Sequence, residues 1–206
     1  MRRSSIGRCG TGLNKEEQNM AKITMPVSND FCPQCLYLYG TYKENGDPNY
    51  GLFCWATYCW DEGLKFVACI GQDKLTRDRI RAEGVFSASI ISEAMLGAAD
   101  YCGTHPGYEF DKSGKMESEE GAVLHVPVPK DGPWTFELQV DKTLPLDDKN
   151  KSEIYICSIR NVLAEECLAG ESDFEERLRQ AAPVISVSTK YFPVRPVSLG
   201  DWGSMG

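Results

Sequence analysis

The stretch from Asn49 to Ile91, NYGLFCWATYCWDEGLKFVACIGQDKLTRDRIRAEGVFSASII, decides the fold of this chain. It contains two runs rich in β-forming residues, Gly51–Tyr58 and Leu64–Ile70. The short turn between them, Asp61-Glu62-Gly63, is acidic and ends in glycine. Two β-rich runs joined by such a turn predict a β-hairpin.

The second part of this stretch combines a polar loop with a short helix. The loop at Gly71–Leu75 precedes a helical pattern at Thr76–Ala82, and Val85–Ile91 reads as a third strand. The second strand gives way to the helix N-terminus at Lys74, Thr76, Arg77 and Arg79. Backbone N–H groups, a hydroxyl and cations together form an anion site at such a position. The stretch therefore predicts a ligand that carries a phosphate group.

Composition and charge exclude several classes of protein. The chain has 206 residues, of which 42% are hydrophobic and 25% charged, and this predicts one sizeable core. Its formal net charge of −8 argues against a nucleic-acid-binding surface. No apolar run approaches the roughly 20 residues that cross a bilayer, and the N-terminus lacks the hydrophobic core of a secretory signal. We therefore expect a cytoplasmic protein that binds neither nucleic acid nor membrane.

The first 19 residues differ from the rest of the chain. They are polar, contain glycine and show no hydrophobic periodicity. We expect residues 1–19 to be a disordered extension, or a spurious one if translation starts at Met20. Residues 20–206 are expected to form a single domain.

The remaining sequence predicts more strands than helices. Further strands are expected at Cys35–Tyr42, Ala122–Val128, Trp134–Lys142, Glu153–Leu163 and Pro183–Ser188. Helices are expected at Ser92–Tyr101 and Ser172–Ala181, each with a serine N-cap, and Cys102–Gly121 reads as a long loop. Many β runs at short spacing with a few short helices predict a mainly β protein that forms a barrel.

Several motifs, taken in order, resemble the flavin reductase-like proteins with an FMN-binding split β-barrel. This family includes flavoredoxins and NAD(P)H:flavin oxidoreductases. The motifs are Met25-Pro26-Val27, Asn49–Thr57, Leu64–Ile70, Asp73–Ile80, Glu83-Gly84-Val85-Phe86, Ala99-Asp100-Tyr101-Cys102-Gly103, Ile154–Asn161 and Leu199-Gly200. The resemblance covers residues 20–206 and implies a Greek-key-like split barrel with a few short helices.

The resemblance also implies an FMN site in the same stretch. The implied cofactor contacts are Cys54, Trp55, Ala56, Thr57, Lys74, Thr76, Arg79 and Ser89. The first four would line the flavin ring, and Lys74, Thr76 and Arg79 would hold the phosphate through charge-assisted hydrogen bonds. The chain departs from the family at Ser89, where many members carry asparagine. It also departs at Tyr58-Cys59-Trp60-Asp61, which replaces a turn similar to Ser-Pro-Pro and implies a bulkier wall beside the ring.

Three further features allow either a plain or a functional interpretation. His105 is either a solvated loop residue or a gating or hydride-donor contact above the flavin. Cys32 and Cys35 form a Cys-x-x-Cys pair, but a strand rather than a helix is expected to follow, and a second pair that would complete a zinc site is lacking. We expect structural thiols there, with thiol redox chemistry as the alternative. Asp111 and Lys112 read as an ordinary surface pair.

The function that these residues favour is redox chemistry on a flavin. We expect an FMN-binding oxidoreductase that uses NADH or NADPH to reduce flavin and passes the electrons to an acceptor. Hydride chemistry of this kind requires no catalytic side chain and no metal. The alternatives are an FMN-binding electron carrier similar to flavoredoxin and fed by a protein donor, and a ligand-binding barrel without flavin. The family resemblance implies a homodimer, and the sequence has no fingerprint that chooses between NADH and NADPH.

Overall fold

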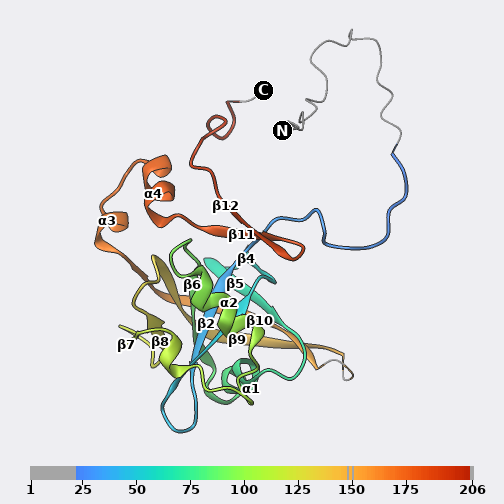
Figure 1. Ribbon diagram of the computed structural model, residues 1–206, viewed down its shortest axis with the longest axis vertical. Helices are drawn as coiled ribbons and strands as arrows, with labels where there is room; N and C mark the ends of the chain where they lie inside the picture. The colour runs from blue at the N-terminus through green and yellow to red at the C-terminus, as the bar shows by residue number, and fades with distance from the viewer. Residues whose placement is uncertain (1–21, 148, 150, 205–206) are drawn as a thin grey trace, which may run out of the picture.

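A seven-stranded antiparallel sheet forms the body of the protein in the computed structural model, which describes residues 22–147, 149 and 151–204 (Figure 1). Its strands are β2 (Tyr37–Tyr42), β3 (Pro48–Phe53), β4 (Ala56–Trp60), β5 (Leu64–Ile70), β6 (Val85–Ile90), β9 (Trp134–Asp147) and β10 (Ser152–Ala164). They pair in the order β3-β2-β6-β9-β10-β5-β4. The sheet therefore begins and ends with two strands that are consecutive in the sequence.

This order forces the sheet to close on itself. The edge strands β3 and β4 are joined only by Cys54 and Trp55. The three steps from Phe53 to Ala56 span at most about 11 Å, little more than twice the 4.8 Å or so between paired strands, so the two edges must approach each other. Among the described residues no ladder pairs β3 with β4, so the barrel is split at this point. The prediction of a mainly β split barrel with a few short helices is confirmed.

The prediction of one strand over Gly51–Tyr58 is wrong. Strand β3 ends at Phe53, and β4 begins at Ala56 on the opposite edge of the sheet. The residues between them are all β-formers, so the local sequence gives no sign of the break. The predicted hairpin between β4 and β5 is confirmed, with Ala56 opposite Ala68 and Trp60 opposite Leu64.

The other elements lie around the barrel. The helices are α1 (Leu75–Glu83), α2 (Leu96–Thr104), the 3-10 turn η1 (Ser113–Lys115), α3 (Glu166–Ala169) and α4 (Phe174–Ala181). There are two small sheets. One pairs β7 (Ser118–Glu120) with β8 (Pro127–Pro129), and in the other β11 (Val184–Val187) lies between β1 (Gln34–Cys35) and β12 (Lys190–Pro193). Helix α1 lies at one end of the barrel, and α3, α4, β11 and β12 lie at the other (Figure 1).

Two more predicted elements need correction. The predicted strand at Ala122–Val128 is mainly a turn, because its backbone N–H groups donate to the buried Glu137 carboxylate instead of to a neighbouring strand. Helix α2 begins at Leu96, although Ser92 still accepts a hydrogen bond from the Met95 N–H, at 3.4 Å. Strand β12 was not predicted. The proposed extension at residues 1–19 lies outside the described residues.

Strand β2 is buried on both of its faces, and it separates two apolar clusters. Tyr37 and Tyr39 point into the barrel with Phe66 and Phe86, whereas Leu38 packs on the other face with residues of α2. Successive side chains of a strand point to opposite faces, so a continuous apolar run serves both layers. The second cluster holds α2 against β3 and so fixes one wall of the site described below.

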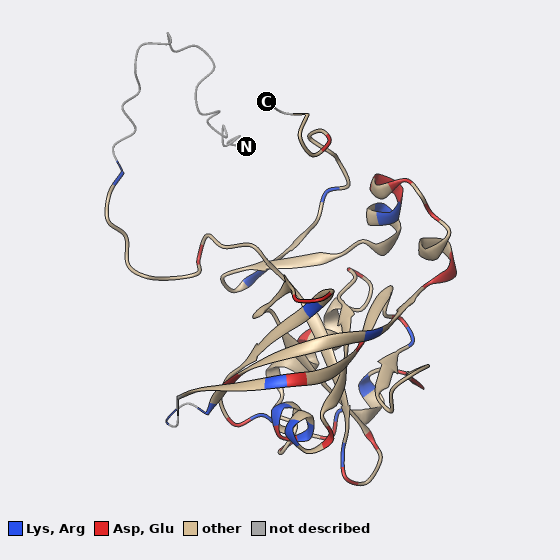
Figure 2. Ribbon diagram, turned by 180° about the vertical axis from the view of Figure 1, so that it is seen from behind, with Lys and Arg blue, Asp and Glu red and all other residues tan. Residues whose placement is uncertain are grey.

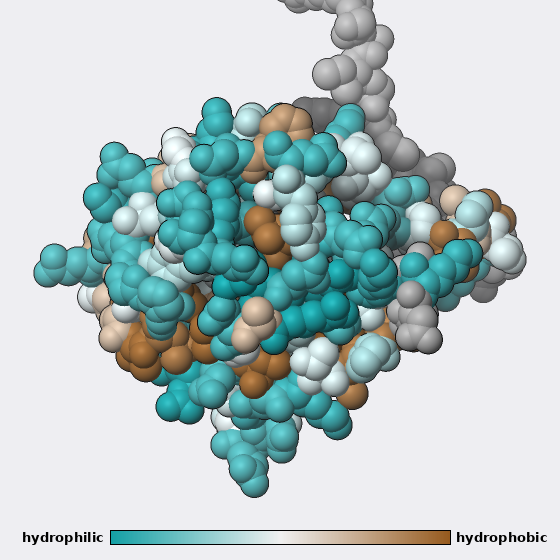
Figure 3. Space-filling model, turned by 90° about the horizontal axis from the view of Figure 1, so that it is seen from below, coloured by the Kyte–Doolittle hydropathy of each residue, from teal (hydrophilic) through white to brown (hydrophobic). Residues whose placement is uncertain are grey.

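Charge and hydropathy are unevenly distributed on the surface. Lysine and arginine gather on α1, and acidic side chains are prominent around α3 and α4 (Figure 2). Seen from below, on the side of α1, the surface is mostly hydrophilic and its apolar residues form separate small patches (Figure 3). Within the described part of the chain, no helix is both long enough and apolar enough to cross a membrane.

Candidate functional site

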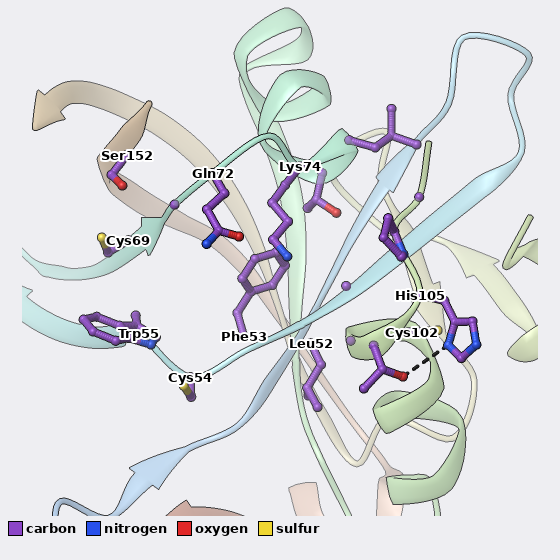
Figure 4. Close-up of a pocket in the computed structure, with 18 of the residues that line it drawn as sticks. Leu52, Phe53, Cys54, Trp55, Cys69, Gln72, Lys74, Cys102, His105 and Ser152 are labelled. Atoms are coloured by element: carbon purple, nitrogen blue, oxygen red, sulfur yellow. Dashed lines mark hydrogen bonds between the residues drawn. The ribbon is translucent and has the colours of Figure 1, made fainter. Parts of the chain in front are cut away.

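A cavity of about 610 Å³ opens where the barrel is split. This volume is within the range of about 300–1,000 Å³ that is usual for cofactor sites. One wall is the end of β3 with Cys54 and Trp55, a second is the loop that enters α1, and a third is the segment from Cys102 to Gly107 (Figure 4). The cavity therefore depends on the strand break that the sequence did not reveal.

The N-terminus of α1 forms the polar end of the cavity. Lys74 is the N-cap residue, and no side chain caps the helix, so its first N–H groups are available to a ligand. Thr76 is 4% exposed and lines the cavity, and its hydroxyl accepts a hydrogen bond of 3.0 Å from the Asn49 side-chain amide. Because the hydroxyl already accepts from Asn49, its own proton can point to a ligand.

Lys112 is a second cation of the cavity, and the sequence interpretation missed it. It is 3% exposed, and its ammonium donates to the Cys102 carbonyl at 3.0 Å, which uses one of its three N–H groups. Burial lowers the pKa of Lys112, and Lys74 and Lys43 lower it further by repulsion. An anion in the cavity would favour the charged ammonium and so oppose both effects on the pKa. Lys112 is thus not the surface partner of Asp111, which pairs with Lys43 at 2.7 Å instead.

The arginines of α1 are held by carboxylates outside this cavity. Arg79 donates to the Tyr42 carbonyl at 2.8 Å and pairs with Glu83 at 2.5 Å, beside a separate small hollow. Arg77 and Arg81 likewise pair with acidic side chains. The structure therefore does not bring Arg79 to Lys74 and Thr76, and the expected three-residue phosphate site is corrected in this respect. Lys112 lies in the cavity instead.

The opposite end of the cavity is apolar and aromatic. Cys54, Trp55 and Cys69 lie together there, and Phe53 lies between them and Lys74 (Figure 4). Phe53 is held flat against Tyr39, with ring centroids 4.6 Å apart and an interplanar angle of 16°. The aromatic rings and thiols at this end can pack against a planar ring.

Three other predicted contacts do not line this cavity. Ala56 and Thr57 line a neighbouring hollow of about 470 Å³ on the far side of Trp55. Ser89 is fully buried in the sheet, where its hydroxyl lies 2.6 Å from that of Thr135. Strand β4 leaves the cavity after Trp55, which explains why only the first two residues of the predicted Cys54–Thr57 run reach it.

His105 and two glycines form the rim of the cavity. His105 stacks on Tyr101, with centroids 3.8 Å apart, and its Nδ1 lies 3.0 Å from the Tyr101 carbonyl and 3.1 Å from the Thr104 hydroxyl (Figure 4). A Cβ at Gly103 would lie 2.8 Å from the Leu52 Cβ, and one at Gly107 would lie 2.8 Å from Asn49 Oδ1. The rim therefore approaches β3 so closely that only glycine fits.

The described residues were also compared with the requirements of a metal site. They contain no group of three or more histidine, cysteine, aspartate or glutamate side chains that could hold a metal ion. The eight described cysteines are all free thiols.

The family model for the flavin reductase like domain matches residues 29–185, which is most of the chain. The chain therefore belongs to the flavin reductase-like family, and this membership supports a flavin cofactor and a redox function. The family resemblance noted from the sequence motifs is confirmed. No curated protein matches the chain.

Solved structures agree with this assignment. The chain is similar to flavoredoxin from Methanosarcina acetivorans, with a TM-score of 0.80 and 22% identity over 90% of this chain and 97% of that one. It is also similar to flavoredoxin of Desulfovibrio vulgaris (Miyazaki F), with a TM-score of 0.76 and 25% identity over 90% and 99% of the two chains. An FMN-binding protein from Thermus thermophilus matches with a TM-score of 0.71 and 18% identity over 88% and 97%.

Proposed function

We propose that this protein is an FMN-binding oxidoreductase that reduces the flavin with NADH or NADPH and passes the electrons to an acceptor. The observation that carries the proposal is the polarity of the cavity. One end has a helix N-terminus, the Thr76 hydroxyl and the ammonium groups of Lys74 and Lys112, whereas the other end is aromatic. A molecule with a phosphate at one end and a planar ring at the other fits this arrangement.

Different residues would bind the phosphate and the ring of the flavin. Lys74, Thr76 and Lys112 would hold the phosphate, because hydrogen bonds between charged partners are about twice as strong as neutral ones. Cys54 and Trp55 would contact the ring. Phe53 lines the cavity between these two ends, where it would pack against the bound molecule and help to exclude water from the ring. When bound, the flavin supplies the hydride and electron chemistry, and the protein supplies position and electrostatics.

His105 would act at the entrance rather than in the chemistry. Its imidazole lines the cavity, and its Nδ1 is engaged with Tyr101 and Thr104, which leaves Nε2 to contact a donor molecule. We therefore include His105 in the proposal as a gating or hydride-donor contact. Ala56 and Thr57 would contact a flavin only from the neighbouring hollow, and Arg79 and Ser89 have no part in the proposed site.

A second candidate function is an electron carrier that retains FMN and receives electrons from another protein. Its support is the similarity to flavoredoxin of Desulfovibrio vulgaris, at 25% identity over most of both chains. The two functions differ in their response to nicotinamide nucleotides. We propose a cytoplasmic location for either one.

We also propose that the protein is a homodimer. Exposed apolar side chains at the tip of the β4–β5 hairpin support this, since Trp60 is 79% exposed and Leu64 is 50% exposed. Light scattering on the purified protein tests the proposal, and a monomer at all concentrations would refute it.

An absorbance spectrum of the purified protein, recorded anaerobically before and after addition of NADH or NADPH, tests the main proposal. We expect the bands of bound flavin, and we expect them to bleach. Bound flavin that does not bleach supports the electron carrier. A protein that neither retains nor binds FMN contradicts both functions.

The phosphate end is tested by comparing FMN with riboflavin, which lacks the phosphate. The double substitution Lys74→Ala with Thr76→Ala should weaken FMN binding by at least about 10-fold, from the roughly 1.5–3 kcal/mol of a hydrogen bond to a charged group. Riboflavin binding should change much less. Equal losses for the two ligands, measured by fluorescence titration, would place the phosphate elsewhere.

A further inference from the structure

Cys32 and Cys35 lie next to the proposed flavin site, although neither lines it. Together with Trp55 and Cys54 they line the second hollow, of about 470 Å³. Trp55, Cys54 and Cys69 line both this hollow and the flavin cavity, so they form the wall between the two. A Cys-x-x-Cys pair alone is weak evidence of redox chemistry, but here only the wall of Trp55, Cys54 and Cys69 separates the pair from the ring end of the proposed flavin site.

The thiols around the two hollows differ in accessibility. Cys32 and Cys35 are exposed, whereas Cys54 and Cys69 are partly buried. Burial raises the pKa of Cys54 and of Cys69, which keeps these two thiols protonated and slow to react. The exposed pair is therefore the one available to a partner molecule, and the buried pair lies between it and the flavin cavity.

The backbone around the pair allows it to close into a disulfide. Residues 22–33 are exposed and form no strand or helix, and the Cys32 N–H bonds only to the Asn29 carbonyl, at 3.0 Å. Cys35 is fixed in β1, opposite Ile185. A disulfide needs Cα atoms within about 7 Å, and Cys32 can move to meet this condition without breaking a ladder of the sheet.

We propose that Cys32 and Cys35 form a redox-active dithiol that exchanges electrons with the flavin and with a low-molecular-weight disulfide. This inference rests on the proposed flavin function. The external disulfide is reduced to two thiols by exchange, and a Cys32–Cys35 disulfide forms, a transfer of two electrons. The reduced flavin then gives two electrons and two protons to this disulfide, its S–S bond breaks, and both thiols are restored.

The hollow favours a small disulfide over a folded protein as the partner. It is open to solvent, apolar on the side of Ile154 and Val67, and bordered by the paired hydroxyls of Tyr37 and Tyr58, 2.9 Å apart. Its volume of about 470 Å³ is in the range of sites for small molecules. Cystine is therefore the probe for the test.

The test follows the thiols directly, in the full-length protein loaded with FMN and kept anaerobic. Cystine is added, free thiols are blocked with iodoacetamide, and peptides are identified by mass spectrometry. The oxidised protein is then photoreduced with light and a sacrificial donor, and the thiols are blocked again. We expect a Cys32–Cys35 disulfide after the first step and its loss after the second, but no loss in flavin-free protein under the same light.

Two matched variants make the result specific. Cys35→Ser should retain FMN but form no disulfide, and its photoreduced flavin should be reoxidised by cystine at least about 10-fold more slowly, because exchange requires a thiolate. Cys59→Ser removes another exposed thiol, outside the hollow, and should behave as the unchanged protein.

The outcomes separate this inference from the proposed function. A protein that binds FMN but forms no Cys32–Cys35 disulfide refutes the dithiol and leaves the flavin function in place. A disulfide that survives photoreduction of bound flavin refutes the exchange between the two. Failure to bind FMN refutes the proposed function, and it also refutes the exchange of electrons between the dithiol and the flavin.

Discussion

Replacing Glu137 by glutamine should destabilise the protein strongly, although Glu137 does not line the proposed flavin cavity. The side chain is fully buried on β9 and accepts four hydrogen bonds. Oε1 accepts from the Ala122 N–H at 3.0 Å and from the Asn161 amide at 2.7 Å. Oε2 accepts from the backbone N–H groups of Val123 and Leu124, at 2.9 and 2.6 Å. One carboxylate thus organises the turn that was predicted to be a strand.

The magnitude follows from these contacts. Glutamine has nearly the same shape, but one of its terminal groups is an N–H donor, which cannot accept the two hydrogen bonds at that position. Each hydrogen bond to a charged acceptor contributes about 1.5–3 kcal/mol, so the loss of two predicts a destabilisation of about 3–6 kcal/mol. This is a large share of the roughly 5–15 kcal/mol of a typical domain.

The pH dependence of stability provides a second readout. Burial raises the pKa of Glu137, but hydrogen bonds from Asn161 and from the backbone of residues 122–124 outweigh it, so the folded-state pKa lies below 4.5. The unfolded chain therefore binds the proton more tightly, and the stabilisation present above pH 4.5 is lost as the pH falls through the folded pKa. Glu137→Gln should remove this part of the acid sensitivity.

Urea denaturation at pH 7 and at lower pH measures both effects. Glu120→Gln is the matched control, because Glu120 lies in the same region but is exposed and bonds to Tyr42 and His125 at the surface. It should change the free energy of unfolding by less than about 1 kcal/mol. A loss below about 1 kcal/mol for Glu137→Gln would show that the carboxylate does not organise the turn.

Two further predictions concern the walls of the cavity. Lys112→Met should weaken FMN binding by about 10- to 100-fold, as expected for the loss of one charge-assisted hydrogen bond. Lys115 is exposed, and Lys115→Met should leave FMN binding unchanged. Fluorescence titration measures both affinities, and similar affinities of the two variants would count against Lys112 as a phosphate contact. Gly103→Ala should lower the melting temperature because its Cβ would lie 2.8 Å from the Leu52 Cβ, at a cost of about 1–3 kcal/mol. Gly97→Ala, in the same helix with open space around it, should be neutral or stabilising, and an equal response of both glycines would contradict the close-packing argument.

The sequence by itself determined the elements whose signals are local. The hairpin turn, strand β5 and helix α1 depend on residues within a few positions, so composition and period predicted them closely. The loop with Lys74 and Thr76 was also found, because an N-terminus of a helix after a strand is a local feature. The spacing of the β runs also predicted a barrel, and the motifs that resemble the family then specified an FMN-binding split barrel.

Only the tertiary structure decided which residues share the cavity. Cys54 and Trp55 continue the β pattern of their neighbours, and they mark a break only because β3 and β4 pair with different strands. Arg79 carries the same charge as Lys74, but Tyr42 and Glu83, from other parts of the fold, hold it outside the cavity. Lys112 is buried only because its loop packs against α2. Long-range pairing and burial are properties of the whole chain, and a local pattern does not encode them.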